Sequence, residues 1–224
     1  MREKLATVLL EKSGIAYSIL DPDELDEAAR LVGSVFSAGS PVTRYLEVSA
    51  GDFTRFVRLL APKFQEEGLS VVARDRETRE MIGALLNEDP GAERPPGART
   101  HEGAERMAPG GAPLEELNRR YFHGRVLEPN IYAHFFFLAV SPRYQGRRIA
   151  QHLVDLCERS ARRRGYKEGV VEATNLISQH VFRKAGFSVR VEIPYAVFEH
   201  NGKRPLEGLK DHPSAMLMVK KWDS

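Results

Sequence analysis

The chain has 224 residues, of which 42% are hydrophobic and 29% are charged, and its net charge at pH 7 is +2. These values are typical of a soluble globular protein, and the length suits a single α/β domain with one elaboration. The near balance of charge gives no global reason to expect binding to nucleic acid or to an anionic membrane. The longest strongly apolar run, residues 135–140, is too short to cross a bilayer as a helix.

Two features of the sequence concern its cellular location. Cys157 is the single cysteine, so an internal disulfide is excluded. The opening "MREKLATVLLEKSG" lacks the longer apolar stretch and the small-residue cleavage site of a signal peptide. Both observations lead us to expect a cytoplasmic protein, because disulfides are rare in that compartment.

Apolar periodicity divides the first 87 residues into strands and helices. Residues 15–20 are expected to form a first strand, and residues 25–36 and 53–64 two amphipathic helices separated by a loop. Residues 69–74 and 81–87 then read as the two strands of a hairpin, because they are joined by the polar stretch "DRETRE".

Residues 88–113 interrupt this apolar periodicity. Ten of these 26 residues are Gly or Pro, and the stretch shows no apolar periodicity. We therefore expect a flexible Gly/Pro-rich insertion within one domain that spans residues 1–224. Its composition leaves two roles open, a lid over a site or a solvated loop. A short helix around residues 114–122 is expected to close it.

The second half of the chain alternates strands and helices. The aromatic, apolar run at 130–140 predicts a central strand. A helix is expected from residue 149 to Gly165, and further elements are expected as a strand at 168–174, a helix at 175–185, a long strand at 187–200 and a last strand at 215–222.

The turn between the central strand and the following helix is a candidate anion site. It contains Gln145, Gly146, Arg147 and Arg148 immediately before the helix. A helix N-terminus presents unpaired backbone N–H groups and the positive end of the helix dipole. Glycine lets a phosphate approach the backbone, and arginine adds forked donors. On its own this segment is compatible with a pyrophosphate site or with an ordinary connection.

A second motif, "NLISQHVFRKAGF" at 175–187, follows the next strand. Together with "FLAVSPRYQGRRIAQHLV" at 137–154 it resembles the two sequence motifs of the GCN5-related N-acetyltransferase (GNAT) superfamily. The matching positions are Gln145, Ala150, Asn175, Ser178, Val181, Phe182, Lys184, Gly186 and Phe187. Two positions depart from the family pattern. Arg148 replaces a glycine, which is tolerable if its φ is helical, and Phe182 replaces a tyrosine that often protonates the departing thiolate.

The resemblance implies a GNAT-like α/β fold. Its sheet is expected to be mixed and mostly antiparallel, with about seven strands, helices on both faces, and a splay between the fourth and fifth strands. It also implies acetyl-CoA as donor, bound in the splay. Cofactor contacts are expected from Leu138, Val140, Gln145, Gly146, Arg147, Arg148, Ile149, Ala150, Asn175 and Phe182.

The predicted reaction is transfer of acetyl to a primary amine by direct attack. The acceptor must be neutral, so a base is needed. His134 is the first candidate, because its strand also resembles that of the arylalkylamine branch, and strand alternation places it beside Phe136 and Leu138. A packed histidine is the alternative. Glu172 is a second candidate base or a surface charge, and Ser178 is a proton relay to the sulfur or a packing residue.

The acceptor itself stays open at this point. Phe136, Tyr195 and Phe198 would suit an arylalkylamine, Glu47 could bind a cation, and a polyamine or a protein N-terminus is also compatible. We expect a small-molecule amine as partner, and we expect no nucleic acid, no membrane and no metal. A homodimer is compatible with the sequence. The rival to an enzyme is a non-catalytic acyl-CoA-binding or sensing module, which the two motif departures would favour.

Overall fold

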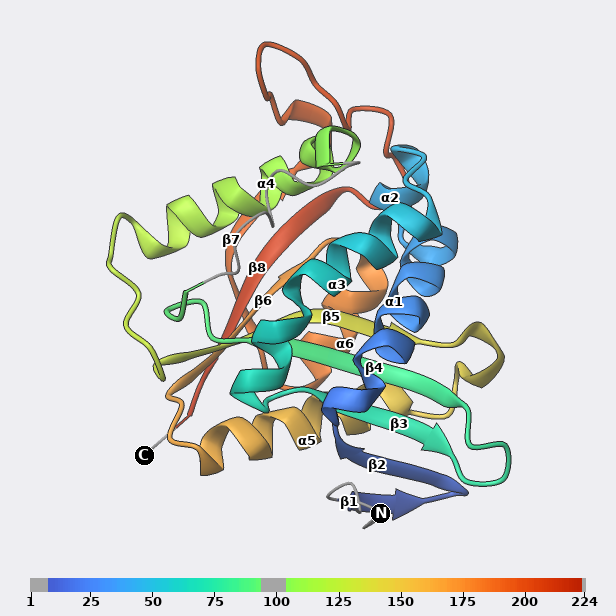
Figure 1. The fold of residues 1–224 in the computed structure, drawn as a ribbon. Helices are drawn as coiled ribbons and strands as arrows, with labels where there is room; N and C mark the ends of the chain where they lie inside the picture. Colours follow the sequence, from blue (N-terminus) through green and yellow to red (C-terminus); the bar gives the residue numbers. More distant parts are fainter. Residues whose placement is uncertain (1–7, 94–103, 223–224) are drawn as a thin grey trace.

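The computed structural model describes residues 8–93 and 104–222 (Figure 1). Its strands are β1 Val8–Lys12, β2 Ile15–Ile19, β3 Val71–Asp75, β4 Met81–Glu88, β5 Tyr132–Val140, β6 Glu168–Ala173, β7 Ser188–Pro194 and β8 Ser214–Lys221. Its α-helices are α1 Leu25–Gly39, α2 Pro41–Tyr45, α3 Ala50–Glu67, α4 Ala104–Phe122, α5 Ile149–Arg163 and α6 Leu176–Lys184.

The strands form one eight-stranded sheet in the order β1-β2-β3-β4-β5-β6-β8-β7. All neighbours are antiparallel except β5 and β6, which run parallel. The expected mixed, mostly antiparallel sheet is therefore confirmed, with one strand more than the seven predicted. The extra strand is β1, which joins β2 through a tight turn at Ser13 and Gly14, both with positive φ. Such a turn matches the twist of a hairpin.

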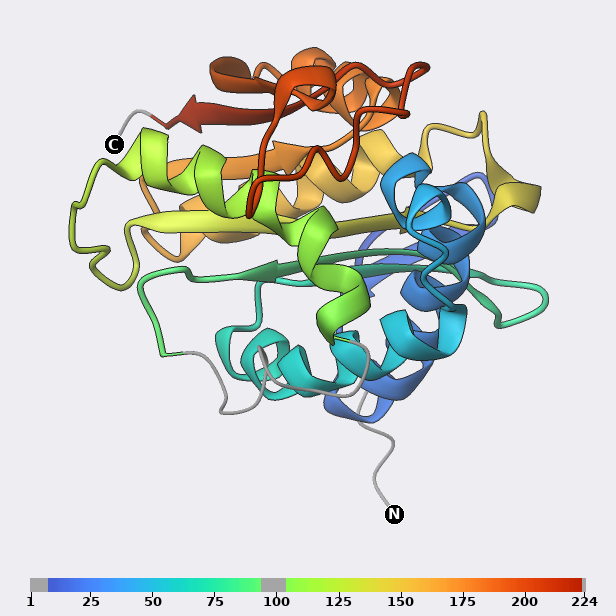
Figure 2. The same ribbon diagram turned by 90° about the horizontal axis from the view of Figure 1, so that it is seen from above.

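Helices cover both faces of the sheet, as predicted (Figure 2). On one face α1 and α3 pack against β4 and each other, and α4 packs against β7 and β8. On the other face α5 packs against β3, β4 and β5, and α6 against β6. Apolar side chains fill both interfaces, so the sheet is buried on each side over its central strands.

Three segments differ from the predictions. Residues 41–45, expected in a loop, form the short helix α2, because Pro41 starts a helical turn. The predicted long strand at 187–200 ends at Pro194 and continues as a 3-10 turn over Tyr195–Val197. A proline cannot donate to the ladder, which explains why the strand stops there.

The predicted insertion at 88–113 is ordered at both ends. Glu88 is the last residue of β4 and is fully buried. Residues 104–113 belong to α4, which carries Pro109 and Pro113 inside it and begins ten residues before the predicted helix. Residues 94–103 lie outside the described residues, so a flexible role for that part stays a prediction. Within the described ranges, no helix is long and apolar enough to cross a membrane.

Gly33 allows α1 and α3 to approach closely, and replacing it should weaken that interface. An alanine Cβ there would lie 2.0 Å from Thr54 Oγ1 and 2.8 Å from the Ala50 carbonyl oxygen. We expect Gly33→Ala to lower the free energy of unfolding by about 1–3 kcal/mol, a fall of roughly 2–4 °C in Tm for each kcal/mol. Gly39→Ala is the matched control, since nothing lies within 4 Å of its added Cβ. Thermal unfolding of both variants checks this, and an equal Tm would contradict it.

Candidate active site

The parallel strands β5 and β6 pair over only three positions. Tyr132, Ala133 and His134 face residues 168–170, and beyond His134 the strands separate. β5 continues for six more residues to Val140 without a partner on this edge. Backbone groups here, including those of Leu138 and Val140, can therefore pair with an extended ligand lying between the strands. The predicted splay is present at the predicted place.

The turn after β5 ends at a helix N-terminus that faces solvent. Gly146 has φ +79°, and Ile149 begins α5. Gln145 and the following residues to Arg148 are exposed, and no backbone acceptor is found within the described residues for the amides of 146–148. Ile149 itself is buried and anchors the helix beneath β4, where an added Cβ on Gly83 would lie 3.0 Å from it. The turn thus has the unpaired donors of an anion site.

The conformation of Arg148 differs from the one expected. The missing glycine was predicted to be harmless if Arg148 had a helical φ, but Arg148 is the N-cap of α5 with φ +60° and ψ +20°. This is the left-handed region, which costs a residue with a Cβ about 1–2 kcal/mol. The neighbouring Arg147 guanidinium lies 5.0 Å from the ring centre of Tyr144, a cation–π contact that holds it over the turn.

A β-bulge changes which side chains of β5 share a face. Leu86 faces Phe137 across the ladder and Asn87 faces Phe135, so Phe136 is an extra residue. A bulge reverses the alternation of side chains that follow it. His134 and Phe136 remain neighbours, with ring centres 4.8 Å apart, whereas Leu138 packs with the core on the opposite face. The prediction that all three lie on one face is therefore wrong for Leu138.

The central feature of the site is a row of three buried ionisable side chains on three adjacent strands. His134 on β5 lies between Glu88 on β4 and Glu172 on β6. Its Nδ1 is 3.0 Å from Glu88 Oε1, and its Nε2 is 2.5 Å from Glu172 Oε2. The side chains of all three are at most 7% exposed. We call these residues the Glu88–His134–Glu172 row.

The geometry of the row requires a proton in each of its two contacts. Each ring nitrogen faces a carboxylate oxygen, and a neutral imidazole can donate to only one of them. Burial by itself would lower the pKa of His134, but the charges and hydrogen bonds of Glu172 and Glu88 outweigh it and raise the pKa to about 9. Burial opposes the ionisation of Glu172, yet the positive His134 lowers the pKa of that carboxyl below its ordinary value. At neutral pH His134 is therefore a cation paired with an ionised Glu172.

The end of β4, which carries Glu88, is held by a second set of buried charges. Lys63 Nζ on α3 donates to the carbonyl oxygens of Asp89 at 2.6 Å and Ala92 at 2.7 Å. Glu67, one turn further along α3, accepts from the Asp89 amide and lies 3.4 Å from Lys63. Burial raises the pKa of Glu67 to about 7. Tyr166 donates to the Asp89 carboxylate at 3.2 Å. These bonds fix the backbone immediately after Glu88.

The predicted residues of α6 divide into two groups. Asn175 is the N-cap, and its Oδ1 accepts from the Ser178 amide at 2.9 Å, while Ser178 Oγ donates to the Asn175 carbonyl at 3.0 Å. Phe182 is only 1% exposed and packs edge-on against Phe135 and Phe187. Its ring therefore packs in the core, and its place in the wall of the cofactor slot stays a prediction.

Two residues of the site were missed from the sequence. Glu88 was placed at the start of the insertion, and it lies opposite His134 because the bulge at Phe136 shifts the register of the two strands by one residue. Asn118 on α4 donates from Nδ2 to Glu172 Oε1 at 2.7 Å, and no local sequence signal indicates this contact, because 54 positions separate the two residues. Glu172, proposed as a base or a surface charge, is buried within the row. Among the described residues, no group of His, Cys, Asp or Glu side chains is arranged to hold a metal ion.

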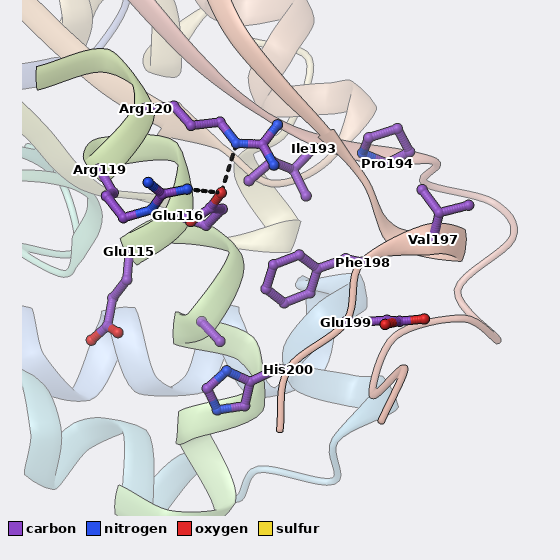
Figure 3. A pocket seen from close by; sticks show the side chains of 11 residues that line it. Glu115, Glu116, Arg119, Arg120, Ile193, Pro194, Val197, Phe198, Glu199 and His200 are labelled. Carbon is purple, nitrogen blue, oxygen red and sulfur yellow. Dashed lines mark hydrogen bonds and ion pairs between the residues drawn. The ribbon is translucent and has the colours of Figure 1, made fainter. Parts of the chain in front are cut away.

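The aromatic residues proposed for the acceptor are not gathered in one place. Phe136 packs near α3, where its ring centre is 6.3 Å from that of Phe64. Tyr195 is 1% exposed and donates to the Thr174 carbonyl oxygen at 2.8 Å. Phe198 lines a separate hollow of about 510 Å³ between α4 and the segment after β7 (Figure 3). There Arg119 and Arg120 both hold Glu116, at 2.6 and 2.7 Å.

Comparisons with known proteins agree with this architecture. Residues 110–187, from α4 to the end of the second motif, match the acetyltransferase (GNAT) family. The C-terminal condensation domain of Ebony, solved with beta-alanyl-dopamine, superposes with a TM-score of 0.79 at 18% identity, covering 93% of this chain and 99% of that domain. The chain has the GNAT fold. The predicted GNAT fold is thereby confirmed, and the match over residues 110–187 agrees with the predicted acetyltransferase class.

Two further structures extend the GNAT comparison. An arylalkylamine N-acetyltransferase-like protein from mosquito has a TM-score of 0.77 at 21% identity, covering 93% of this chain and 100% of its own. A putative acetyltransferase from Salmonella typhimurium, solved with its cofactor acetyl-CoA, has a TM-score of 0.54 at 15% identity. The match covers 95% of this chain and 96% of that protein. Acetyl-CoA is the donor that this family uses, as predicted. A comparison of the sequence with curated proteins finds no match.

The left-handed conformation of Arg148 yields a prediction about stability. Glycine adopts φ +60° without steric cost, whereas alanine keeps the Cβ clash. We expect Arg148→Gly to be more stable than Arg148→Ala by about 1 kcal/mol, although glycine also loses more backbone entropy on folding. Urea unfolding of the pair measures the difference. Equal stability, or a less stable glycine variant, would show that this position is not strained.

The row yields a second prediction, on the pH dependence of stability. The folded pKa of His134 is about 9, above the ordinary 6.5 of the unfolded chain. Its contribution to stability is therefore complete below pH 6.5 and is lost as the pH rises through 9. We expect the unfolding free energy of the wild type to fall more steeply between pH 7 and 10 than that of His134→Gln. Urea unfolding across this range tests it, and parallel curves would contradict it.

Proposed function

We propose that the protein is an N-acetyltransferase that moves the acetyl group of acetyl-CoA to a primary amine by direct attack. The observation that carries this proposal is the separation of β5 from β6 after His134, beside the exposed amides at the start of α5. A slot with an unpaired strand edge on one side and a helix N-terminus at its end suits a molecule with amide groups and a diphosphate.

Acetyl-CoA would lie in this slot, with the pantetheine paired to the backbone of Leu138 and Val140. The amides of residues 145–150 would bind the diphosphate, and the guanidinium groups of Arg147 and Arg148 would add charge-assisted hydrogen bonds. The free Nδ2 of Asn175 would donate to the pantetheine, since its Oδ1 already caps α6. A backbone N–H near the bulge would polarise the thioester carbonyl.

The Glu88–His134–Glu172 row would receive the proton of the acceptor. An alkylammonium has a pKa of ~10, and it must lose a proton before its nitrogen can attack. A base whose pKa is about 9 takes that proton at a cost of about 1.4 kcal/mol, whereas a base with pKa 6.5 would meet a cost of about 5 kcal/mol. Because His134 is protonated at neutral pH, the row acts as a base only in the fraction of molecules where it has lost one proton.

The bonds of the reaction balance as follows. The amine nitrogen attacks the thioester carbonyl carbon, the carbon–sulfur bond breaks, and coenzyme A leaves as a thiolate. The nitrogen gives up two protons. The first passes from the ammonium to the row before the attack, with His134 as the base and Glu88 and Glu172 stabilising its charge. The second leaves the nitrogen as the carbon–sulfur bond breaks and neutralises the thiolate. Ser178 is proposed as the relay that returns a proton to the sulfur, in place of the tyrosine that Phe182 replaces.

A small amine is the proposed acceptor. The two buried carboxyl groups beside His134 favour a cationic substrate over an anionic one. The mosquito arylalkylamine N-acetyltransferase-like structure supports an amine with an aromatic side chain as the first compound to test. We also propose a cytoplasmic location, based on the single cysteine, and no role in binding nucleic acid, based on the balanced charge.

The decisive experiment measures thiol release from acetyl-CoA across a panel of aryl, alkyl and polyamine acceptors. We expect turnover with at least one primary amine and acetyl-CoA binding by calorimetry. Binding without turnover on any acceptor would instead support the acyl-CoA-sensing module. Absence of binding would overturn both readings.

The pH dependence of kcat should follow the protonation state of the row. With a pKa of about 9, only about one row in a hundred is in its basic form at pH 7, so kcat should rise about tenfold per pH unit and level off above pH 9. His134→Gln should lower kcat and remove this rise, while the Kd of acetyl-CoA changes little. His123→Gln, which alters an exposed histidine at the end of α4, is the control. A rise centred near pH 6.5, or one that survives in His134→Gln, would exclude this role.

A further inference from the structure

Asn118 connects the helix α4 to the buried row. Its Nδ2 donates one hydrogen bond to Glu172 Oε1 at 2.7 Å and a second to the Leu114 carbonyl oxygen at 2.9 Å. Both donors of the amide are therefore in use. The bond to Leu114 lies within the same helix and fixes the orientation of the amide, so the remaining N–H can point only toward Glu172.

The carboxylate of Glu172 depends on this contact. Oε2 accepts from His134, and Oε1 accepts from Asn118. The side chain is 4% exposed, so water does not solvate the charge. Burial works against the ionised form, and the interactions with His134 and the hydrogen bond from Asn118 lower the pKa of Glu172. A buried carboxylate oxygen without a donor loses the stabilisation of a charge-assisted hydrogen bond.

We propose that Asn118 is a positioning residue that holds Glu172 ionised and aimed at His134, and so sets how readily the row takes a proton from the acceptor. This inference rests on the proposed function for its consequence in catalysis. Asn118 acts through Glu172 and makes no contact with the reacting atoms.

Several charged or titratable groups surround the row besides its three members. Lys63 and Glu67 approach from α3, Asp89 follows Glu88 on β4, and Tyr121 on α4 donates to Glu168 on β6 at 3.2 Å. Glu168 is also 3.5 Å from Lys221 on β8. In the described part of the chain none of these groups forms a hydrogen bond with Glu172, whereas Asn118 bonds it directly. Of these neighbours, Asn118 is therefore the one whose replacement changes the surroundings of the Glu172 carboxylate most directly.

The contribution of Asn118 to packing can be separated from this role. α4 is seated by Leu117, which is fully buried, and by Gly110, whose added Cβ would lie 3.1 Å from Val42 and from Leu46 on α2. These apolar contacts do not involve the amide. A residue with a merely structural role would change the free energy of unfolding when replaced, but it would leave the titration of His134 unchanged.

The test replaces Asn118 by Leu, which is similar in size but donates no hydrogen bond. Without the donor, the state in which both carboxylates are charged and His134 is neutral becomes harder to reach. We expect the titration of the row, followed by NMR of the His134 ring, to move upward by about one pH unit or more. The inflection of kcat should move with it, so kcat at pH 7.5 falls about tenfold while the KM for acetyl-CoA is unchanged.

Two further variants complete the test. Asn118→Asp places a third carboxylate beside Glu172 and should shift the titration in the same direction, which keeps the inference testable if the leucine variant does not fold. Glu115→Gln removes a charge from the exposed side of the same helix and is the matched control, with no shift expected.

The NMR titration does not require turnover, so it separates this inference from the proposed function. A shifted titration in a protein that acetylates no amine would retain the role of Asn118 and reject the enzyme. An unshifted titration in folded Asn118→Leu and Asn118→Asp, or an equal shift in Glu115→Gln, would overturn the inference.

Discussion

The separation of two parallel strands after a single short run of pairing is the constraint on which the rest of the site depends. β5 and β6 are joined at His134 and Val170 and no further along, so the backbone of β5 beyond that rung has no partner. An unpaired edge in the middle of a sheet is costly unless a ligand occupies it. The bulge at Phe136 falls at the same point, and there it turns Leu138 away from the face that carries His134.

The buried row sits at the last paired rung for a related reason. Three strands must lie side by side to bring Glu88, His134 and Glu172 into line, and beyond His134 that arrangement ends. Isolated charges at this depth would each cost several kcal/mol, so the three are stable only as a hydrogen-bonded set. The bonds around Asp89 on one side and from Asn118 on the other hold the two carboxylates in place. The row is therefore a rigid proton-binding unit rather than three independent groups.

The sequence predicted the fold well because its signals are local. Apolar periodicity located nearly every strand and helix, and the first motif located the separated strand end and the helix N-terminus at residues 138–150. The errors have physical causes. Gly and Pro in residues 104–113 indicated a loop, yet tertiary packing of α4 against α2 and the sheet keeps that stretch helical. A bulge cannot be read from alternation, which is why Leu138 was assigned to the wrong face. A residue other than glycine at position 148 was tolerable on the condition of a helical φ, and Arg148 does not meet that condition.

The row shows where sequence reading reaches its limit. His134 was found from its residue type and its strand, but its pKa depends on two carboxylates that lie 46 and 38 positions away. A free histidine suits a base at neutral pH, whereas His134 between two buried glutamates is a cation there. The pairing of strands, not the identity of one residue, thus decides at which pH the site can accept a proton.

The fold alone does not determine which acceptor the site takes. A condensation domain solved with beta-alanyl-dopamine and a putative acetyltransferase solved with acetyl-CoA share this architecture. The architecture therefore does not fix the acceptor, and the acceptor must be argued from the site. In this chain the site combines a row of high proton affinity with a donor from α4, the helix that follows the Gly/Pro-rich segment. This combination is the reason for proposing an amine that stays an ammonium ion until it reaches the row, because its pKa would then be close to that of the row.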